Sequence, residues 1–326
     1  MTLAWASLAT CLHVLPGCQA DQSTNAPSTF ERTPLVIDHE AWQSHGLRGR
    51  RIRTRHFTIY STVRDAMAEE LLPGFLENLY DRFEQLLPPR NSTEGRIELY
   101  ALGDRGEWDR FVHREFRQAV GDLDMGVLVA HGGLTIGERA TCFYSTRADL
   151  FSCAAHEAFH AYHNIAVDDS LPSWLAEGMA TYYESALPHN ERLQHNKRHN
   201  SIRRNGLCRS IQIGRTLTVE QLATTTSREI LNERDRYLVA AYYGQMWALV
   251  SFLKDAGPQN LRDSFKQLTT DLRDGRFKAR VSAAAVTTPE SADLPYGLQV
   301  FHAYFGPCTA DLESAYADYL LEVCGF

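Results

Sequence analysis

The chain has 326 residues, of which 44% are hydrophobic, 22% charged and 10% aromatic, and this balance is typical of a globular protein rather than a disordered or fibrous one. Its net charge of −7 at pH 7 argues against a nucleic-acid-binding protein, because such proteins carry a broad basic surface. A local basic run at 48–55 is expected to be solvated surface. After residue 18 no apolar run reaches 18 residues, so we predict no further membrane-spanning segment.

The first residues have the outline of an export signal. The stretch 1–15 is largely apolar, Pro16 and Gly17 precede Cys18, and the chain then turns polar. This pattern is typical of a bacterial signal that ends at a lipid-modified cysteine, with a plain cleaved signal as the alternative because no basic residue precedes the apolar stretch. We expect a signal or lipobox at 1–18, a tether at 19–45, and an exported protein. It would be a cell envelope lipoprotein or a periplasmic or extracellular protein, and would touch a membrane only through a lipid anchor at Cys18.

Residues 46–148 are predicted to form a small mixed sheet with helices, as the first part of one domain that continues to residue 326. Alternating apolar residues indicate strands, and apolar residues at helical spacing indicate helices. The expected strands are 54–60, 96–100, 125–130 and 141–145, and the expected helices are 66–87, with a break at Pro73, and 108–116.

Residues 149–326 are predicted to be mainly helical. A sheet followed by helices, without alternating strand–helix units, indicates an α+β fold. The expected helices are 149–167, 173–186, 236–254, 260–272, 294–305 and 309–323.

The strongest chemical signal is the sequence His156-Glu157-Ala158-Phe159-His160, which matches H-E-x-x-H. On a helix the two histidines lie one turn apart on one face, so both rings can reach a single Zn²⁺. Glu157 is displaced around the helix and can accept a proton from a water at the metal. The motif falls within an amphipathic helix, which favours a zinc site over a coincidental match.

A catalytic zinc site needs a third protein ligand and an open fourth position. Glu177 is the predicted third ligand, because it lies 17 positions after His160 on a helix that can fold back across the first. His163 and Glu184 are rival ligands. The metzincin pattern fails, because His163 occupies the position of its glycine and Ala166 that of its last histidine.

Five cysteines follow the leader, at 142, 153, 208, 308 and 324. In an exported protein, pairs such as Cys142 with Cys153 or Cys308 with Cys324 could oxidise, although connectivity cannot be read from sequence. No C-x-x-C pair is present, so a cysteine zinc site is not predicted. Cys153 is interpreted as a buried apolar residue.

The motif pair H-E-A-F-H and P-S-W-L-A-E-G-M-A resembles the peptidase MA-like gluzincins, which are bacterial exported zinc metallopeptidase-like proteins. The similarity extends over about residues 50–325 and includes the segments 55–60, 242–250 and 311–320. The resemblance implies a zincin-like fold, His156, His160 and Glu177 as metal ligands, and Glu157 as general base. It also implies Tyr243, with Tyr242 as the alternative, as a phenol that stabilises the oxyanion of a tetrahedral intermediate.

These features predict a zinc-dependent metallopeptidase that acts on a peptide or protein and not on nucleic acid. The expected strand 141–145 is a candidate edge for an extended peptide. The first alternative is a catalytically degenerate zincin that serves as an anchored binding module of the cell envelope. The second is a partner-binding envelope protein whose histidines hold no metal. The oligomeric state is not predicted.

Overall fold

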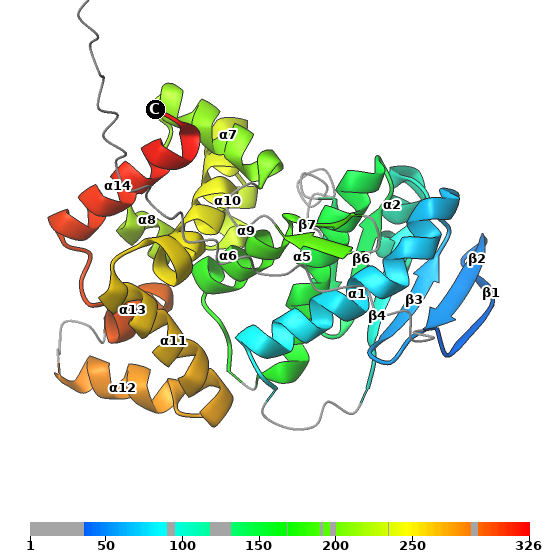
Figure 1. Cartoon of the computed structure of the whole chain (residues 1–326), viewed down its shortest axis with the longest axis horizontal. Helices are drawn as coiled ribbons and strands as arrows, with labels where there is room; N and C mark the ends of the chain where they lie inside the picture. Colours follow the sequence, from blue (N-terminus) through cyan, green and yellow to red (C-terminus); the bar gives the residue numbers. More distant parts are fainter. Residues whose placement is uncertain are drawn as a thin grey trace, which may run out of the picture.

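The computed structural model describes residues 36–89, 95–117, 132–167, 169–189, 192–195, 200–233, 235–287 and 293–326. Within these residues the chain forms a mixed six-stranded sheet with helices, followed by a mostly helical part, and the two lie side by side in Figure 1. The predicted α+β class is therefore confirmed. The expected leader at 1–18 and the expected strand 125–130 lie outside the described residues.

The strands of the sheet lie in the order β1–β2–β3–β4–β6–β5. Strands β3, β4 and β6 are parallel, whereas β1, β2 and β5 pair with antiparallel neighbours. The bounds are Asp38–Ser44 for β1, Leu47–Arg53 for β2, Phe57–Ser61 for β3, Ile97–Leu102 for β4, Gly133–Ile136 for β5 and Arg139–Phe143 for β6.

Strand β1 lies inside the predicted tether at 19–45, so that boundary is wrong for residues 38–44. Its residues pair with β2 along their whole length. Two arginines of the basic run at 48–55 face acidic residues of β1 across this pair of strands. Arg51 lies 2.9 Å from Glu40, and Arg53 lies 2.7 Å from Asp38.

The two faces of the sheet carry separate hydrophobic cores. Residues of β4 alternate between them, as the period of a strand requires: Leu99 packs with α1 (Ala66–Leu86) and α5 (Arg147–Ala166), whereas Leu102 packs with α2 (Arg105–Glu115) on the opposite face. Helix α5 is thereby held against β6, β5 and β4. Helix α1 continues through Pro73, where we predicted a break.

The rest of the chain is helical apart from the hairpin of β7 and β8, and Figure 1 shows it beside the sheet. The predicted helix 173–186 ends at Tyr183, because residues 186–189 form β7. Helix α10 is buried along its second half and continues as a π-helical turn, Phe252–Ala256. The bounds are Ser173–Tyr183 for α6, Ala186–His189 for β7, Arg192–His195 for β8, Ser201–Gln212 for α7, Val219–Thr224 for α8, Ser227–Leu231 for α9, Arg236–Ser251 for α10, Gln259–Asp274 for α11, Phe277–Thr287 for α12, Tyr296–Phe305 for α13 and Ala310–Cys324 for α14.

A disulfide joins Cys208 of α7 to Cys324 at the end of α14. The suggested pairing of Cys308 with Cys324 is therefore wrong. Cys142 and Cys153 form no disulfide, although their side chains are in hydrogen-bonding contact, and Cys308 forms no disulfide either. Spacing could not reveal the observed bridge, since 116 positions separate its cysteines and only the docking of α14 on α7 brings them together.

No helix in the described part of the chain combines the length and apolar character needed to cross a membrane.

Candidate metal centre

The centre of the site is the middle of α5. The helix begins at Thr146, whose hydroxyl oxygen accepts a hydrogen bond from the backbone N–H of Asp149. Ten residues further on, the helical spacing places His156 and His160 on one face, with their Nε2 atoms 3.1 Å apart.

Glu177 approaches both histidines from α6. Its Oε2 atom lies 3.4 Å from Nε2 of His156 and 3.5 Å from Nε2 of His160. Two atoms bound at about 2.0 to 2.1 Å to a tetrahedral ion lie about 3.3 Å from each other. The triangle of 3.1, 3.4 and 3.5 Å therefore has the size of one face of a tetrahedral metal site.

The state of the Glu177 carboxylate also fits a metal ion. Its Oε1 atom accepts a hydrogen bond of 2.8 Å from the hydroxyl of Ser227 on α9, whereas its Oε2 atom is buried and accepts no hydrogen bond from the described residues. Leaving a buried carboxylate oxygen unsatisfied is costly unless a ligand completes it. His156, His160 and Glu177 form a group that could hold a metal ion, but the geometry by itself does not select zinc.

Electrostatics couple the three side chains. Burial opposes protonation of His156, but the carboxylate of Glu177, 3.4 Å from its Nε2 atom, and the carboxylate of Glu184, hydrogen-bonded to its Nδ1 atom, outweigh burial and raise its pKa to about 10. Burial alone would raise the pKa of Glu177, yet the nearby His160 and His156 hold it well below its usual range. A metal ion would have to displace the proton on His156, so we expect metal binding to weaken as the pH falls.

The rival ligands lie behind the histidines and not beside them. Oε1 of Glu184 accepts a hydrogen bond of 2.7 Å from Nδ1 of His156, and Nε2 of His163 lies 3.5 Å from Nδ1 of His160. In metal sites such outer groups fix the ring orientation of a ligand histidine. Glu184 is in turn bound by Arg203 and Asn200, two residues at the start of α7 that sequence reasoning missed.

Glu157 occupies a tight site between α5 and β5. Its Oε2 atom accepts a hydrogen bond of 2.6 Å from the hydroxyl of Thr135. A Cβ atom at Gly133 would lie 2.5 Å from Oε1 of Glu157, so a larger residue at this position of β5 would displace the Glu157 carboxylate. Burial raises the pKa of Glu157, while His156 and His160 act in the opposite direction.

The two candidate tyrosines are buried residues of α10 on the far side of Glu177. The Tyr242 hydroxyl donates a hydrogen bond of 3.2 Å to the backbone carbonyl of Thr225. The ring of Tyr243 lies 5.1 Å from the guanidinium carbon of Arg203. Burial, followed by the charge of Glu177, raises the pKa of Tyr243 well above its usual range. These contacts place Tyr243 near the metal ligands but do not test its catalytic role.

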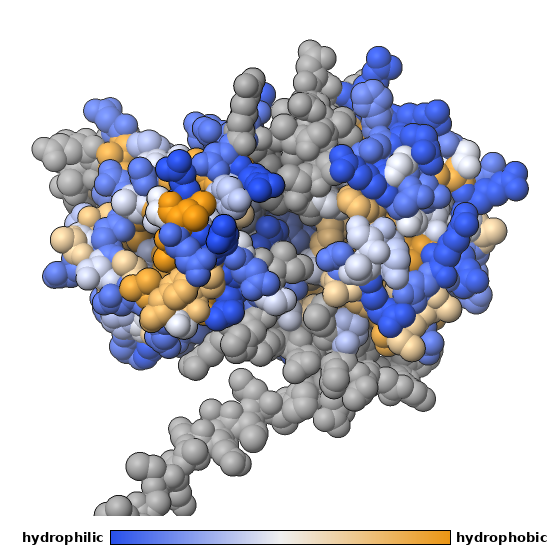
Figure 2. Space-filling view, turned by 90° about the horizontal axis from the view of Figure 1, so that it is seen from above, coloured by the Kyte–Doolittle hydropathy of each residue, from blue (hydrophilic) through white to orange (hydrophobic). Residues whose placement is uncertain are grey.

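The site is not sealed from solvent. The side chains of His160 and Glu177 retain 16% and 14% of their exposure. Figure 2 shows a hollow between two lobes of the molecule, with hydrophilic surface in its depth. The expected peptide-binding edge at 141–145 is wrong, because β6 pairs with β4 on one side and with β5 on the other. Among the described residues, β5 is the last strand at this end of the sheet.

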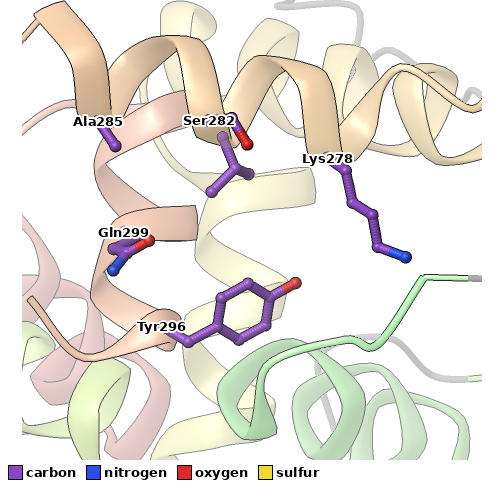
Figure 3. A pocket seen from close by; sticks show the side chains of 6 residues that line it. Lys278, Ser282, Ala285, Tyr296 and Gln299 are labelled. Atoms are coloured by element: carbon purple, nitrogen blue, oxygen red, sulfur yellow. The ribbon is translucent and has the colours of Figure 1, made fainter. Parts of the chain in front are cut away.

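A separate cavity of about 360 Å³ lies between α12 and α13 and contains none of the predicted site residues. Lys278 pairs with Asp169 at 3.1 Å, and the Tyr296 hydroxyl donates to the carbonyl of Ser170 at 2.7 Å. These contacts tie the cavity walls to the connection between α5 and α6. The lining side chains, shown in Figure 3, are Lys278, Val281, Ser282, Ala285, Tyr296 and Gln299.

A comparison with models of protein families gives no match, and a comparison with curated proteins gives none either.

Proposed function

We propose that the protein is a zinc-dependent metallopeptidase of the gluzincin type, with a zincin-like fold. The observation that carries the proposal is the triangle formed by Nε2 of His156, Nε2 of His160 and Oε2 of Glu177, with the Glu157 carboxylate one residue along the same helix. Two imidazoles and one carboxylate are a ligand set of catalytic zinc sites, because they leave a fourth position open.

When bound, the zinc ion supplies Lewis-acid chemistry, which polarises the attacking water and the substrate carbonyl. Glu157 then accepts the proton of the water and returns it to the leaving amine. The hydrogen bond from Thr135 holds the Glu157 carboxylate for this transfer. Tyr243, with Tyr242 as the alternative, donates a hydrogen bond to the developing oxyanion.

The substrate class in this proposal is a peptide or protein. A substrate strand could add to β5, since among the described residues this strand is the last of the sheet and carries Gly133 and Thr135 beside Glu157. Export to the cell envelope, with Cys18 as lipid anchor, belongs to the same proposal. The alternative to be distinguished from this proposal is a binding module that binds zinc but hydrolyses no peptide.

The test compares Glu157→Gln with His160→Ala on a library of fluorogenic peptides. We expect Glu157→Gln to retain one zinc per chain and to lower kcat by about 10²- to 10⁴-fold, because the variant cannot accept the proton. His160→Ala should lose zinc and activity together. Full turnover in the Glu157 variant would refute the mechanism. Zinc binding by the unaltered protein with no cleavage of any peptide would favour the binding module.

A further inference from the structure

Glu184 uses its whole acceptor capacity. Oε1 accepts from Nδ1 of His156 at 2.7 Å and from Nη2 of Arg203 at 2.6 Å. Oε2 accepts from Nε of Arg203 at 2.7 Å and from Nδ2 of Asn200 at 3.1 Å. A carboxylate offers about four acceptor positions, so four donors leave it no alternative arrangement. Its orientation is therefore fixed, and with it the ring of His156.

Arg203 supplies two of these four donors, and its own position is fixed from another side. The planar guanidinium donates two hydrogen bonds to the carboxylate, one to each oxygen, and lysine cannot reproduce this bidentate geometry. Its Cζ atom lies 5.1 Å from the centre of the Tyr243 ring, within the range of a cation–π contact. Arg203 is thus held between α10 and the turn that follows α6.

We propose that Arg203 is a positioning residue of the metal centre: it holds Glu184 in the orientation that aims Nε2 of His156 at the metal. Arg203 donates to none of the three metal ligands and acts on His156 through Glu184, while its contact with Tyr243 is made to the face of the ring. The inference rests on metal binding at the proposed site, but it does not require that the protein cleave peptides.

Arg204 provides a matched control. It is the next residue of α7 and is also partly buried, but it donates to the carbonyl oxygens of Val323 and Cys324 at 2.7 and 3.2 Å. Its contacts therefore hold α14 and do not reach the site. If a loss of zinc affinity reflected only damage to α7, it would appear in the variants of both Arg203 and Arg204.

The experiment measures the zinc dissociation constant by competition with a chromophoric chelator, the visible spectrum of the Co²⁺-loaded protein, and the melting temperature. The variants are Arg203→Gln, Arg203→Lys, Glu184→Gln, the double variant Arg203→Gln/Glu184→Gln, and the control Arg204→Gln. We expect Arg203→Gln to weaken zinc binding about 10- to 100-fold and to alter the Co²⁺ spectrum, since outer partners of ligand histidines have effects of this size. Arg203→Lys should recover only part of the affinity, and Arg204→Gln should bind zinc as the unaltered protein does.

The double variant tests whether Arg203 acts through Glu184. If it does, the double variant binds zinc no more weakly than Glu184→Gln alone, because the two losses are not additive. Unchanged zinc affinity in Arg203→Gln, or losses that add in full, would overturn the inference. If Arg203→Gln does not fold, Arg203→Lys decides in the same way, since it keeps the buried charge.

Failure of the inference can be told from failure of the proposed function. Zinc binding that responds to Arg203 without any peptidase activity would refute only the peptidase. If Arg203→Gln binds zinc and cleaves peptides as the unaltered protein does, only the inference would be refuted. A protein that binds neither Zn²⁺ nor Co²⁺ would refute both.

Discussion

The three glutamates of the site have different partners, and the partners decide what each can do. Glu177 faces two histidines and keeps one oxygen without a hydrogen bond, which suits a metal ligand. Glu157 is held by Thr135 and has a pKa raised by burial, which suits a proton acceptor. Burial would raise the pKa of Glu184, but Arg203 and His156 hold it near 2, so Glu184 stays charged and can hold a histidine ring. Sequence alone could not separate these roles, because all three residues are glutamates on or beside a helix.

A fourth buried glutamate gives a prediction about stability and pH. Glu77 of α1 accepts hydrogen bonds from the Thr54 hydroxyl at 2.5 Å, the His56 backbone N–H at 2.8 Å and Nδ1 of His56 at 2.6 Å. Burial raises the pKa of Glu77, but these bonds outweigh it and bring the pKa below its usual 4.5. Because the folded pKa is lowered, the stabilisation is present above about pH 4.5 and is lost as the pH falls through the folded value.

We therefore expect Glu77→Gln to lower the free energy of unfolding by about 1 to 3 kcal/mol at pH 7, since it weakens charge-assisted hydrogen bonds in a buried site. Urea unfolding of both proteins at pH 7 and at about pH 3 measures the difference. The difference between the free energies of unfolding of the two proteins should become smaller at the lower pH. An equal difference at both values would show that the charge of Glu77 does not contribute.

At the scale of elements, the site depends on how closely α6 packs against α10. A Cβ atom at Gly178 would lie 2.4 Å from Cγ2 of Val250 and 3.0 Å from the carbonyl oxygen of Met246. Glycine at this position lets the two helices approach, and the preceding residue, Glu177, is thereby brought to the histidines of α5. The small residues that follow Glu177 in the sequence, Gly178 and Ala180, suit close helix packing, but they do not show which helix is the partner.

Gly178→Ala should lower the free energy of unfolding by about 1 to 3 kcal/mol, because the added methyl group overpacks the contact with α10. It should also weaken zinc binding, since α6 carries Glu177. Adding Val250→Ala removes the nearest atom, so the double variant should recover part of both losses. Thermal unfolding and zinc titration measure these effects. If Val250→Ala brings no recovery, the contact with Val250 is not the cause.

At the scale of the whole molecule, the candidate metal centre lies where the sheet part meets the helical part. Helix α5, packed on the sheet, brings His156, Glu157 and His160. The helical part brings Glu177 from α6, Ser227 from α9 and Arg203 from α7. The disulfide from Cys208 to Cys324 then fastens α7 to the end of the chain. The site is complete only when both parts have folded and docked.

Replacing both cysteines of this disulfide by alanine should lower the free energy of unfolding by about 2 to 5 kcal/mol, because the bridge closes a long loop and restricts the unfolded chain. Guanidinium unfolding of the oxidised protein and the variant tests this, with Cys308→Ala as the control for a free thiol. Reduction of the unaltered protein should reproduce the loss. Identical unfolding curves for variant and oxidised protein would contradict the prediction.

The sequence by itself determined the ligand-bearing segments, because helical periodicity is local and fixes His156 and His160 on one face of α5. It also determined the α+β class and most helices with strong apolar periodicity. It did not reveal β1, β2, β5, β7, β8, α7, α8, α9 or α12, which are short or lack a strong apolar period. The capping residues Asn200 and Thr226 were local signals that helices begin there, but they carry no information about contacts.

Only the tertiary structure decided that Glu177 lies beside the Nε2 atoms of His156 and His160, whereas Glu184 and His163 contact the Nδ1 atoms of these histidines. The choice depends on the close approach of α6 and α10 and on the place of Arg203 beside Glu184. These are contacts between distant segments, fixed by packing and by the need to satisfy buried charges. A local pattern in one sequence cannot encode them.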